Sequence, residues 1–111
     1  METAIRENGS LVIIDITGEI DLYHANDLRQ QIKELQENGQ VKIIVNLKEA
    51  PYIDSSGIGV LTSNLRSLQK SGGDLKICHL QDPVQKIFEF SKLNTLFQIF
   101  ETEEDAVASW L

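Results

Sequence analysis

Three short apolar runs, each separated from the next by a stretch with helical periodicity, constrain the fold of this chain most. The runs are Leu11–Thr17, Val41–Leu47 and Leu75–Leu80, and they are rich in the β-branched residues that favour strands. Strands that alternate with helices form a mostly parallel sheet through right-handed crossovers. The alternation therefore predicts an α/β fold whose binding site lies at the carboxyl ends of the strands.

The intervening segments carry apolar residues at the spacing of one helical face: Ala25, Leu28, Ile32 and Leu35 in the first, then Ile58, Leu61, Leu65 and Leu68 in the second. Asn38-Gly39 and Gly72-Gly73 are typical of the ends of these helices. Asp82, followed by proline, predicts the N-cap of a third helix, and Thr102 predicts the N-cap of a fourth. A short strand is expected at Phe97–Phe100.

The first strand is expected on the antiparallel edge of the sheet. Asn8-Gly9 separates a run near Thr3–Glu7 from Leu11–Thr17, which predicts a hairpin with a type I′ turn. The full order is then β-β-α-β-α-β-α-β-α. The chain has 111 residues, a common length for one domain. We therefore expect residues 1–111 to form a single α/β domain with a mixed, mostly parallel sheet of about five strands and about four helices.

Charge and composition narrow the possible functions. The chain carries 17 acidic and 10 basic side chains, a net charge of -7, and no segment is rich in Lys and Arg. This balance argues against binding to nucleic acid or to an anionic membrane surface. The N-terminus does not resemble a signal peptide, and no apolar run approaches the ~20 residues of a membrane span, so a cytoplasmic protein is expected.

The sequence also offers little for cofactor or metal chemistry. One cysteine, Cys78, and two histidines without ligand spacing predict no disulfide and no metal site. Glycine-rich phosphate-binding motifs are absent. Cys78 lies in an apolar run, where a small buried hydrophobe is expected. No cofactor is expected, and the protein is not expected to be an enzyme.

The segment Asp54–Gly59 lies at a junction between a strand, a loop and a helix. Asp54 or Ser55 can cap the helix, and a helix N-terminus tolerates the charge of a phosphate on a first-turn serine. Gly57 and Gly59 remove side chains there, which would let another chain approach the serine hydroxyl. On physical grounds alone, an ordinary helix cap whose glycines serve helix–sheet packing is the favoured interpretation of this segment.

This segment resembles the signature of the STAS family, named for sulfate transporters and anti-sigma factor antagonists. The resemblance is carried by Tyr52–Leu61, by Thr17–Asp21 and by the buried strand Val41–Leu47, and it extends over essentially the whole chain. The chain is most similar to stand-alone anti-sigma factor antagonists. The order of elements inferred above agrees with the fold of this family.

The resemblance implies a switch controlled by phosphorylation. The partner is an anti-sigma factor with a histidine-kinase-like ATPase fold, which binds the unphosphorylated protein and phosphorylates the serine after the aspartate. That serine is Ser55 here, with Ser56 as the alternative acceptor, and a serine phosphatase resets the switch. Asp21 and Asp54 match acidic positions that border the site, and Ser56, Gly57 and Gly59 flank it. We expect Ser55 at the surface, at a helix N-terminus.

Two other functions are compatible with the sequence. One is a non-phosphorylated STAS subunit of a transport or lipid-trafficking complex, which would need no acceptor serine. The other is a small hydrolase that uses Ser55 with His24 or His79 as a base. The sequence contains no Gly-x-Ser-x-Gly elbow that would favour a hydrolase. No oligomeric state is predicted.

Overall fold

The computed structural model describes residues 1–111, and its elements follow the predicted order. The strands are β1 (Glu2–Asn8), β2 (Leu11–Thr17), β3 (Lys42–Glu49), β4 (Asp74–Cys78) and β5 (Gln98–Phe100). The helices are α1 (Leu22–Glu37), α2 (Ser55–Lys70), α3 (Asp82–Phe90) and α4 (Glu103–Ala108), with a 3-10 turn at Leu93–Thr95. The predicted α/β fold with five strands and four helices is confirmed.

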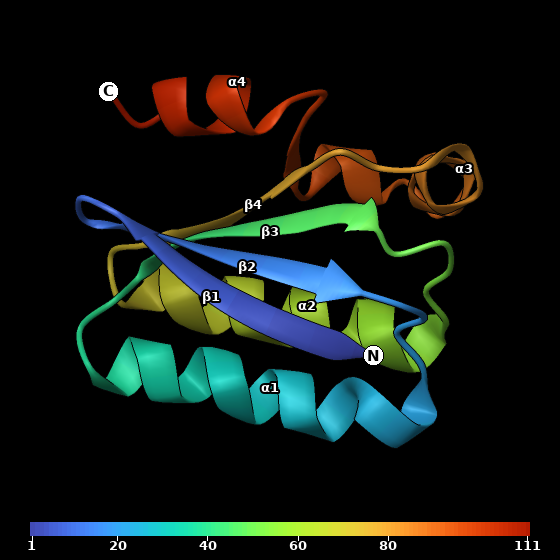
Figure 1. Cartoon of the computed structure of the whole chain (residues 1–111), viewed down its shortest axis with the longest axis horizontal. Coiled ribbons are helices and arrows are strands. Elements are labelled where there is room, and N and C mark those ends of the chain that lie inside the picture. The colour runs from blue at the N-terminus through green and yellow to red at the C-terminus, as the bar shows by residue number, and fades with distance from the viewer.

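The sheet is mixed, with strand order β1-β2-β3-β4-β5, and only β1 runs antiparallel to its neighbour. Side chains alternate between its faces along each strand. Ile14, Val45 and Ile77 point into the main core, which α1, α2 and α3 complete. On the other face α4 covers a smaller apolar cluster that includes Ile13 and Ile44. Figure 1 shows α1 and α2 below the sheet and α4 above it.

Two local predictions are wrong, and both concern the ends of elements. Asn8 pairs with Leu11 in the β1–β2 ladder, so the turn is Gly9-Ser10, with a positive φ only at Gly9. That pattern is typical of a type II′ turn, whereas type I′ needs two positive φ angles. Gln81, rather than Asp82, is the N-cap of α3, and Asp82 lies within the first turn. There its carboxylate interacts favourably with the helix dipole.

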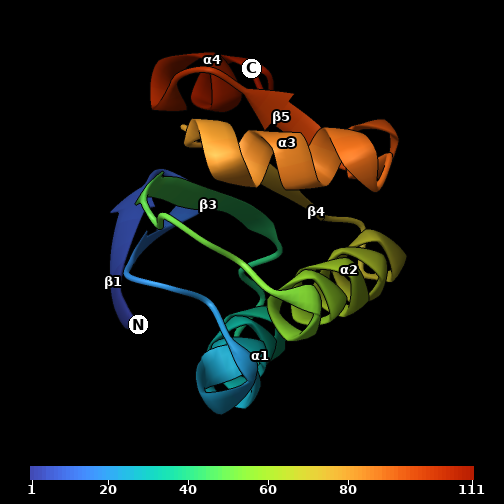
Figure 2. The same cartoon turned by 90° about the vertical axis from the view of Figure 1, so that its right-hand side faces the viewer.

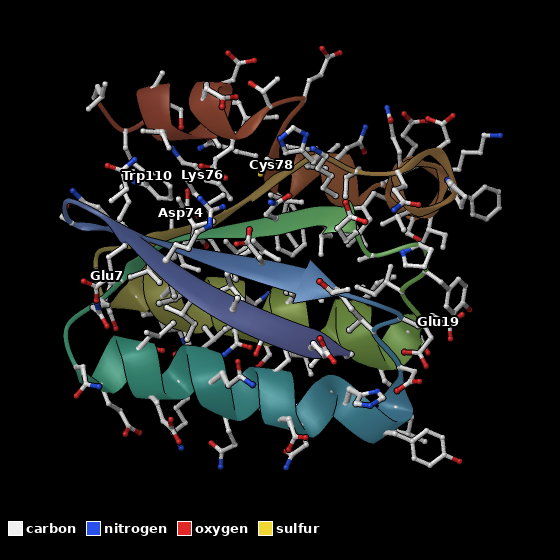
Figure 3. All side chains as sticks on the ribbon, viewed as in Figure 1. Glu7, Glu19, Asp74, Lys76, Cys78 and Trp110 are labelled. Atoms are coloured by element: carbon white, nitrogen blue, oxygen red, sulfur yellow. The ribbon has the colours of Figure 1, made fainter.

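The contact between α4 and the sheet includes a buried lysine. Lys76 of β4 is only 4% exposed, and its Nζ lies 3.9 Å from the ring centroid of Trp110 and 2.7 Å from Ser109 Oγ. Figure 3 shows Lys76 and Trp110 next to each other between α4 and the sheet. Burial lowers the pKa of Lys76. The ring face and the hydroxyl replace part of the hydration that the ammonium loses.

Cys78 lies on the same face of the sheet and is fully buried, as the sequence predicted. Burial raises the pKa of its thiol to about 12, so the reactive thiolate is scarce at neutral pH.

An ion-pair network ties β1 to β2 and α4. Arg6 Nε lies 2.6 Å from Asp15 Oδ2 and Arg6 Nη2 lies 2.8 Å from Asp15 Oδ1, while Arg6 also donates to Glu103. The hydrogen bonds from Arg6 outweigh desolvation and hold the pKa of Asp15 below its ordinary value. Because this pKa is lower in the folded protein, the ionised Asp15 stabilises the fold at pH values above the pKa of the unfolded chain. This contribution is lost as the pH falls through the lower pKa of the folded protein.

Asp15→Asn is therefore expected to lower the stability at pH 7 by about 1 kcal/mol, the scale of a partly exposed bidentate pair. Below about pH 4 the difference from the wild type should shrink, because the unfolded wild-type chain then takes up a proton on Asp15. The difference should vanish at lower pH, once Asp15 of the folded protein is protonated as well. Denaturant unfolding between pH 2 and pH 7 measures this. Asp27→Asn, on an exposed part of α1, is the control. A difference that does not depend on pH would contradict the prediction.

Candidate functional site

The segments that follow β2 and β3 run side by side, at the carboxyl ends of these neighbouring parallel strands. Ile20 and Ile53 form an isolated parallel bridge, and both side chains are buried. Ile20 N donates to Tyr52 O at 3.0 Å, and Asp54 N donates to Ile20 O at 3.0 Å. This bridge fixes the chain immediately before α1 and α2. In Figure 1 both helices begin at the end of the molecule to which the β2 and β3 arrows point.

The aspartate after each isoleucine caps the helix that follows. Asp21 Oδ1 accepts from Tyr23 N at 3.0 Å, and Asp54 Oδ1 accepts from Ser56 N at 2.9 Å and Gly57 N at 3.1 Å. Asp54 has a second function, because its Oδ2 accepts from Leu22 N of α1 at 3.1 Å. One carboxylate thus joins the N-termini of both helices. Their positive dipole ends converge on one corner of the protein.

Ser55 is the first residue of α2 and is exposed, and its hydroxyl makes no hydrogen bond. This confirms the expected position at the surface and at a helix N-terminus. Ser56 is partly buried, and its backbone N–H is taken by Asp54. A phosphate group can therefore be attached to Ser55 Oγ without breaking a hydrogen bond of that hydroxyl.

The two glycines of the segment differ in their surroundings. Gly57 is buried, and a Cβ there would lie 2.7 Å from both Ile20 Cγ2 and Ile53 Cγ1. Gly57 is therefore required for packing of α2 against the isoleucine bridge, and the expectation that it opens the serine to another chain is wrong. Gly59 is exposed, and a Cβ added there would have no neighbour within 4 Å. That surface is open to another chain.

His24 is hydrogen bonded to the α1 cap rather than to the serine. Its Nδ1 lies 2.7 Å from Asp21 Oδ1. Desolvation raises the pKa of Asp21, but the contacts with His24 and the backbone N–H groups lower it more, so the net shift is downward. Ser55 is hydrogen bonded to neither histidine, and His79 Nε2 instead accepts from Glu103 N near α4. The base–nucleophile pair of a hydrolase is not assembled.

Sequence reasoning missed the apolar rim of this corner. Leu22 is 71% exposed, Tyr23 is 88% exposed and Tyr52 is 45% exposed, all on the two segments that the isoleucine bridge joins. A signal was available, because large apolar residues adjoin both capping aspartates in loops expected at the carboxyl ends of strands. Exposed aromatic residues of this kind are typical of protein interfaces.

Two further observations concern metals and membranes. No group of three or more His, Cys, Asp or Glu side chains is placed to hold a metal ion. None of the helices has the length and apolar character that crossing a membrane requires.

Comparison with known proteins identifies the class to which this fold and corner belong. The STAS domain family matches residues 2–106, so the chain belongs to the STAS family. Within that family, an anti-sigma-B factor antagonist of Bacillus subtilis is 31% identical over 103 residues, which cover 93% of this chain and 94% of the relative.

Solved structures agree with this assignment. A crystal structure of a Thermotoga maritima protein superimposes with a TM-score of 0.92 at 22% identity, covering 96% of this chain and 92% of the other. The Bacillus cell-fate determinant SpoIIAA in its phosphorylated form has a TM-score of 0.78 at 25% identity, covering 99% of this chain and all (100%) of the other. The first shows a shared fold. The second shows that a similar protein exists in a phosphorylated form.

Proposed function

We propose that this protein is an anti-sigma factor antagonist that binds its anti-sigma factor when unphosphorylated and is inactivated by phosphorylation of Ser55. The observation that carries the proposal is the exposed, unbonded hydroxyl of Ser55 at the first position of α2, within the STAS signature. Relatives named as antagonists and a neighbour solved in a phosphorylated form support it.

The surroundings of Ser55 suit a surface that changes affinity when it is charged. The apolar rim of Leu22, Tyr23 and Tyr52 offers contact area to a partner. The carboxylates of Asp21 and Asp54 lie on the segments beside it, so a phosphate adds to an existing negative charge. The converging helix N-termini offset part of that charge within the protein itself. The fold is therefore expected to tolerate a modification that the partner does not.

The proposed partners follow from the family. The kinase is the anti-sigma factor itself, with a histidine-kinase-like ATPase fold, and a serine phosphatase reverses the modification. In this proposal residues 1–111 act as one STAS domain in the cytoplasm, as a binding protein rather than an enzyme. Sigma factor is released when the antagonist occupies the anti-sigma factor.

Incubation with the ATPase-type anti-sigma factor of the same organism and ATP is expected to add one phosphate, at Ser55. Peptide mass spectrometry identifies the modified residue. Ser55→Ala should abolish the modification, and Ser56→Ala should leave it intact because the Ser56 hydroxyl is not the acceptor. Phosphate found only on Ser56 would move the site by one residue. No modification by any kinase of this type would favour a non-phosphorylated subunit of a transport or lipid-trafficking complex.

A further inference from the structure

Basic side chains that are dispersed in the sequence gather on the outer side of α1 and α2. Arg29 and Lys33 project from α1, and Arg66 and Lys70 project from α2. All four lie at the surface and none forms an ion pair, although the chain carries a net charge of -7. No Asp or Glu lies within α2. Figure 2 shows the two helices side by side on the same face of the sheet. The hollows that the two basic pairs line adjoin one another at Ser63 and Ser67.

A groove with a volume of about 390 Å³ lies between the two helices. Gln36 of α1 lines this groove and forms hydrogen bonds across to the α2 side, where it donates to Ser67 Oγ at 3.0 Å and to Ser71 Oγ at 2.8 Å. A second hollow continues along α2 and shares Ser63 and Ser67 with the first. Neither is lined by a hydrophobic residue. Hydroxyl groups therefore occupy the centre of a continuous polar surface. Arg29, Lys33 and the carboxylate of Glu37 lie on the α1 side of it, and Arg66 and Lys70 lie on the other.

A buried amide in the wall of this groove lacks a partner. Asn64 lines the groove and is only 5% exposed, and its Oδ1 accepts no hydrogen bond. A buried carbonyl oxygen without a donor reduces the stability of the folded state. Because the protein does not hold this oxygen, rotation of the amide can present either its donor or its acceptor to a ligand in the groove.

We propose that the groove between α1 and α2 binds a small polar ligand that carries phosphate groups. The four cationic side chains outnumber the one carboxylate, Glu37, and lie as two pairs on opposite sides of a row of hydroxyls. This arrangement matches a ligand with anionic groups at both ends of a polar body. A nucleotide is disfavoured because no aromatic side chain lines the groove on which a base can stack. A protein partner is disfavoured because no apolar anchor lines the groove. The proposal is independent of the function assigned to Ser55.

Titration of the full chain with inorganic tripolyphosphate and with a hexose bisphosphate, followed by NMR at low salt, tests this site. Shifts are expected along the facing sides of α1 and α2. The double variants Arg29→Gln/Lys33→Gln and Arg66→Gln/Lys70→Gln should each bind at least tenfold more weakly. Lys86→Gln/Lys92→Gln removes the same charge from exposed positions near α3 and should change affinity less than twofold.

Asn64→Leu tests the role of the amide and distinguishes the two probes. It should raise the melting temperature, since it removes an unpaired buried oxygen, and should weaken binding of the hexose bisphosphate, whose hydroxyls can donate to that oxygen. Tripolyphosphate has no alcohol hydroxyl, so its affinity should change much less. The proposal is overturned if neither probe shifts α1 and α2, if shifts are confined to the corner around Ser55, or if the Lys86→Gln/Lys92→Gln control weakens binding as much as the groove variants.

Discussion

Replacement of Ser55 by aspartate is expected to weaken binding of the anti-sigma factor by about thirty- to several-thousand-fold, which corresponds to ~2–5 kcal/mol. In the proposed complex the partner covers the exposed Ser55 hydroxyl and the surrounding rim. A carboxylate there would be desolvated without a matching cation, beside Asp21 and Asp54. A phosphate, with a charge of about -2 at neutral pH, should act in the same direction.

Calorimetric titration of the partner into wild type, Ser55→Asp and Ser55→Ala measures this effect. Ser55→Ala should bind like the wild type but resist inactivation by the kinase. Ser10→Asp is the matched control, because it adds the same charge in the exposed β1–β2 turn, at the opposite end of β2 from the site. All four proteins should melt at similar temperatures. Equal affinities for Ser55→Asp and wild type would reject the charge mechanism, and a large fall in melting temperature for Ser55→Asp would indicate unfolding of the site instead.

Gly57→Ala is expected to have the largest effect on the fold at this corner. The added methyl group would lie 2.7 Å from Ile20 and from Ile53, and 3.1 Å from the Ile20 carbonyl oxygen. Overpacking of this kind costs about 1–3 kcal/mol, more than the helix propensity gained from alanine offsets. Displacement of Ile20 would also move Asp21, so binding of the partner should weaken together with stability.

Gly59→Ala provides the comparison, since the same change at the next glycine of α2 meets open space. It should stabilise the protein by about 0.5–1 kcal/mol through the higher helix propensity of alanine. Denaturant unfolding gives both free energies. If Gly59→Ala is stable yet binds the anti-sigma factor poorly, the partner contacts this turn of α2 directly. Equal destabilisation by both variants would show that packing against the isoleucine bridge is not the reason for Gly57.

Local pattern was sufficient to predict the order of elements and the position of Ser55. Apolar periodicity and cap residues depend on neighbouring residues, so the strand at Leu11–Thr17 and the helix that begins at Ser55 could both be inferred without tertiary information. The N-cap of α3 and the type of the first turn could not be predicted from local pattern. The first depends on the residue at which the helix begins, and the second depends on the residue at which the β1–β2 ladder ends. A shift of one residue in the β1–β2 pairing changes the turn type.

The remaining features of the corner depend on contacts between distant segments. The requirement for Gly57 arises from Ile20, and the second bond of Asp54 is made to Leu22, on a different helix. The basic surface likewise exists only because α1 packs beside α2, which brings Lys33 and Arg66 onto one face. No window of the sequence contains such information. The STAS resemblance supplied the candidate serine, and the packing explains how the residues around it are held.

The single cysteine provides an internal reporter of motion at the C-terminal end of the chain. Cys78 is completely covered in the folded protein, in the apolar cluster to which Ala106 of α4 also belongs. A thiol-specific reagent can therefore reach it only when α4 detaches from the sheet or the whole protein unfolds. The rate of labelling in mild denaturant, compared with the rate of global unfolding, would give the free energy of that local opening without the introduction of any foreign probe.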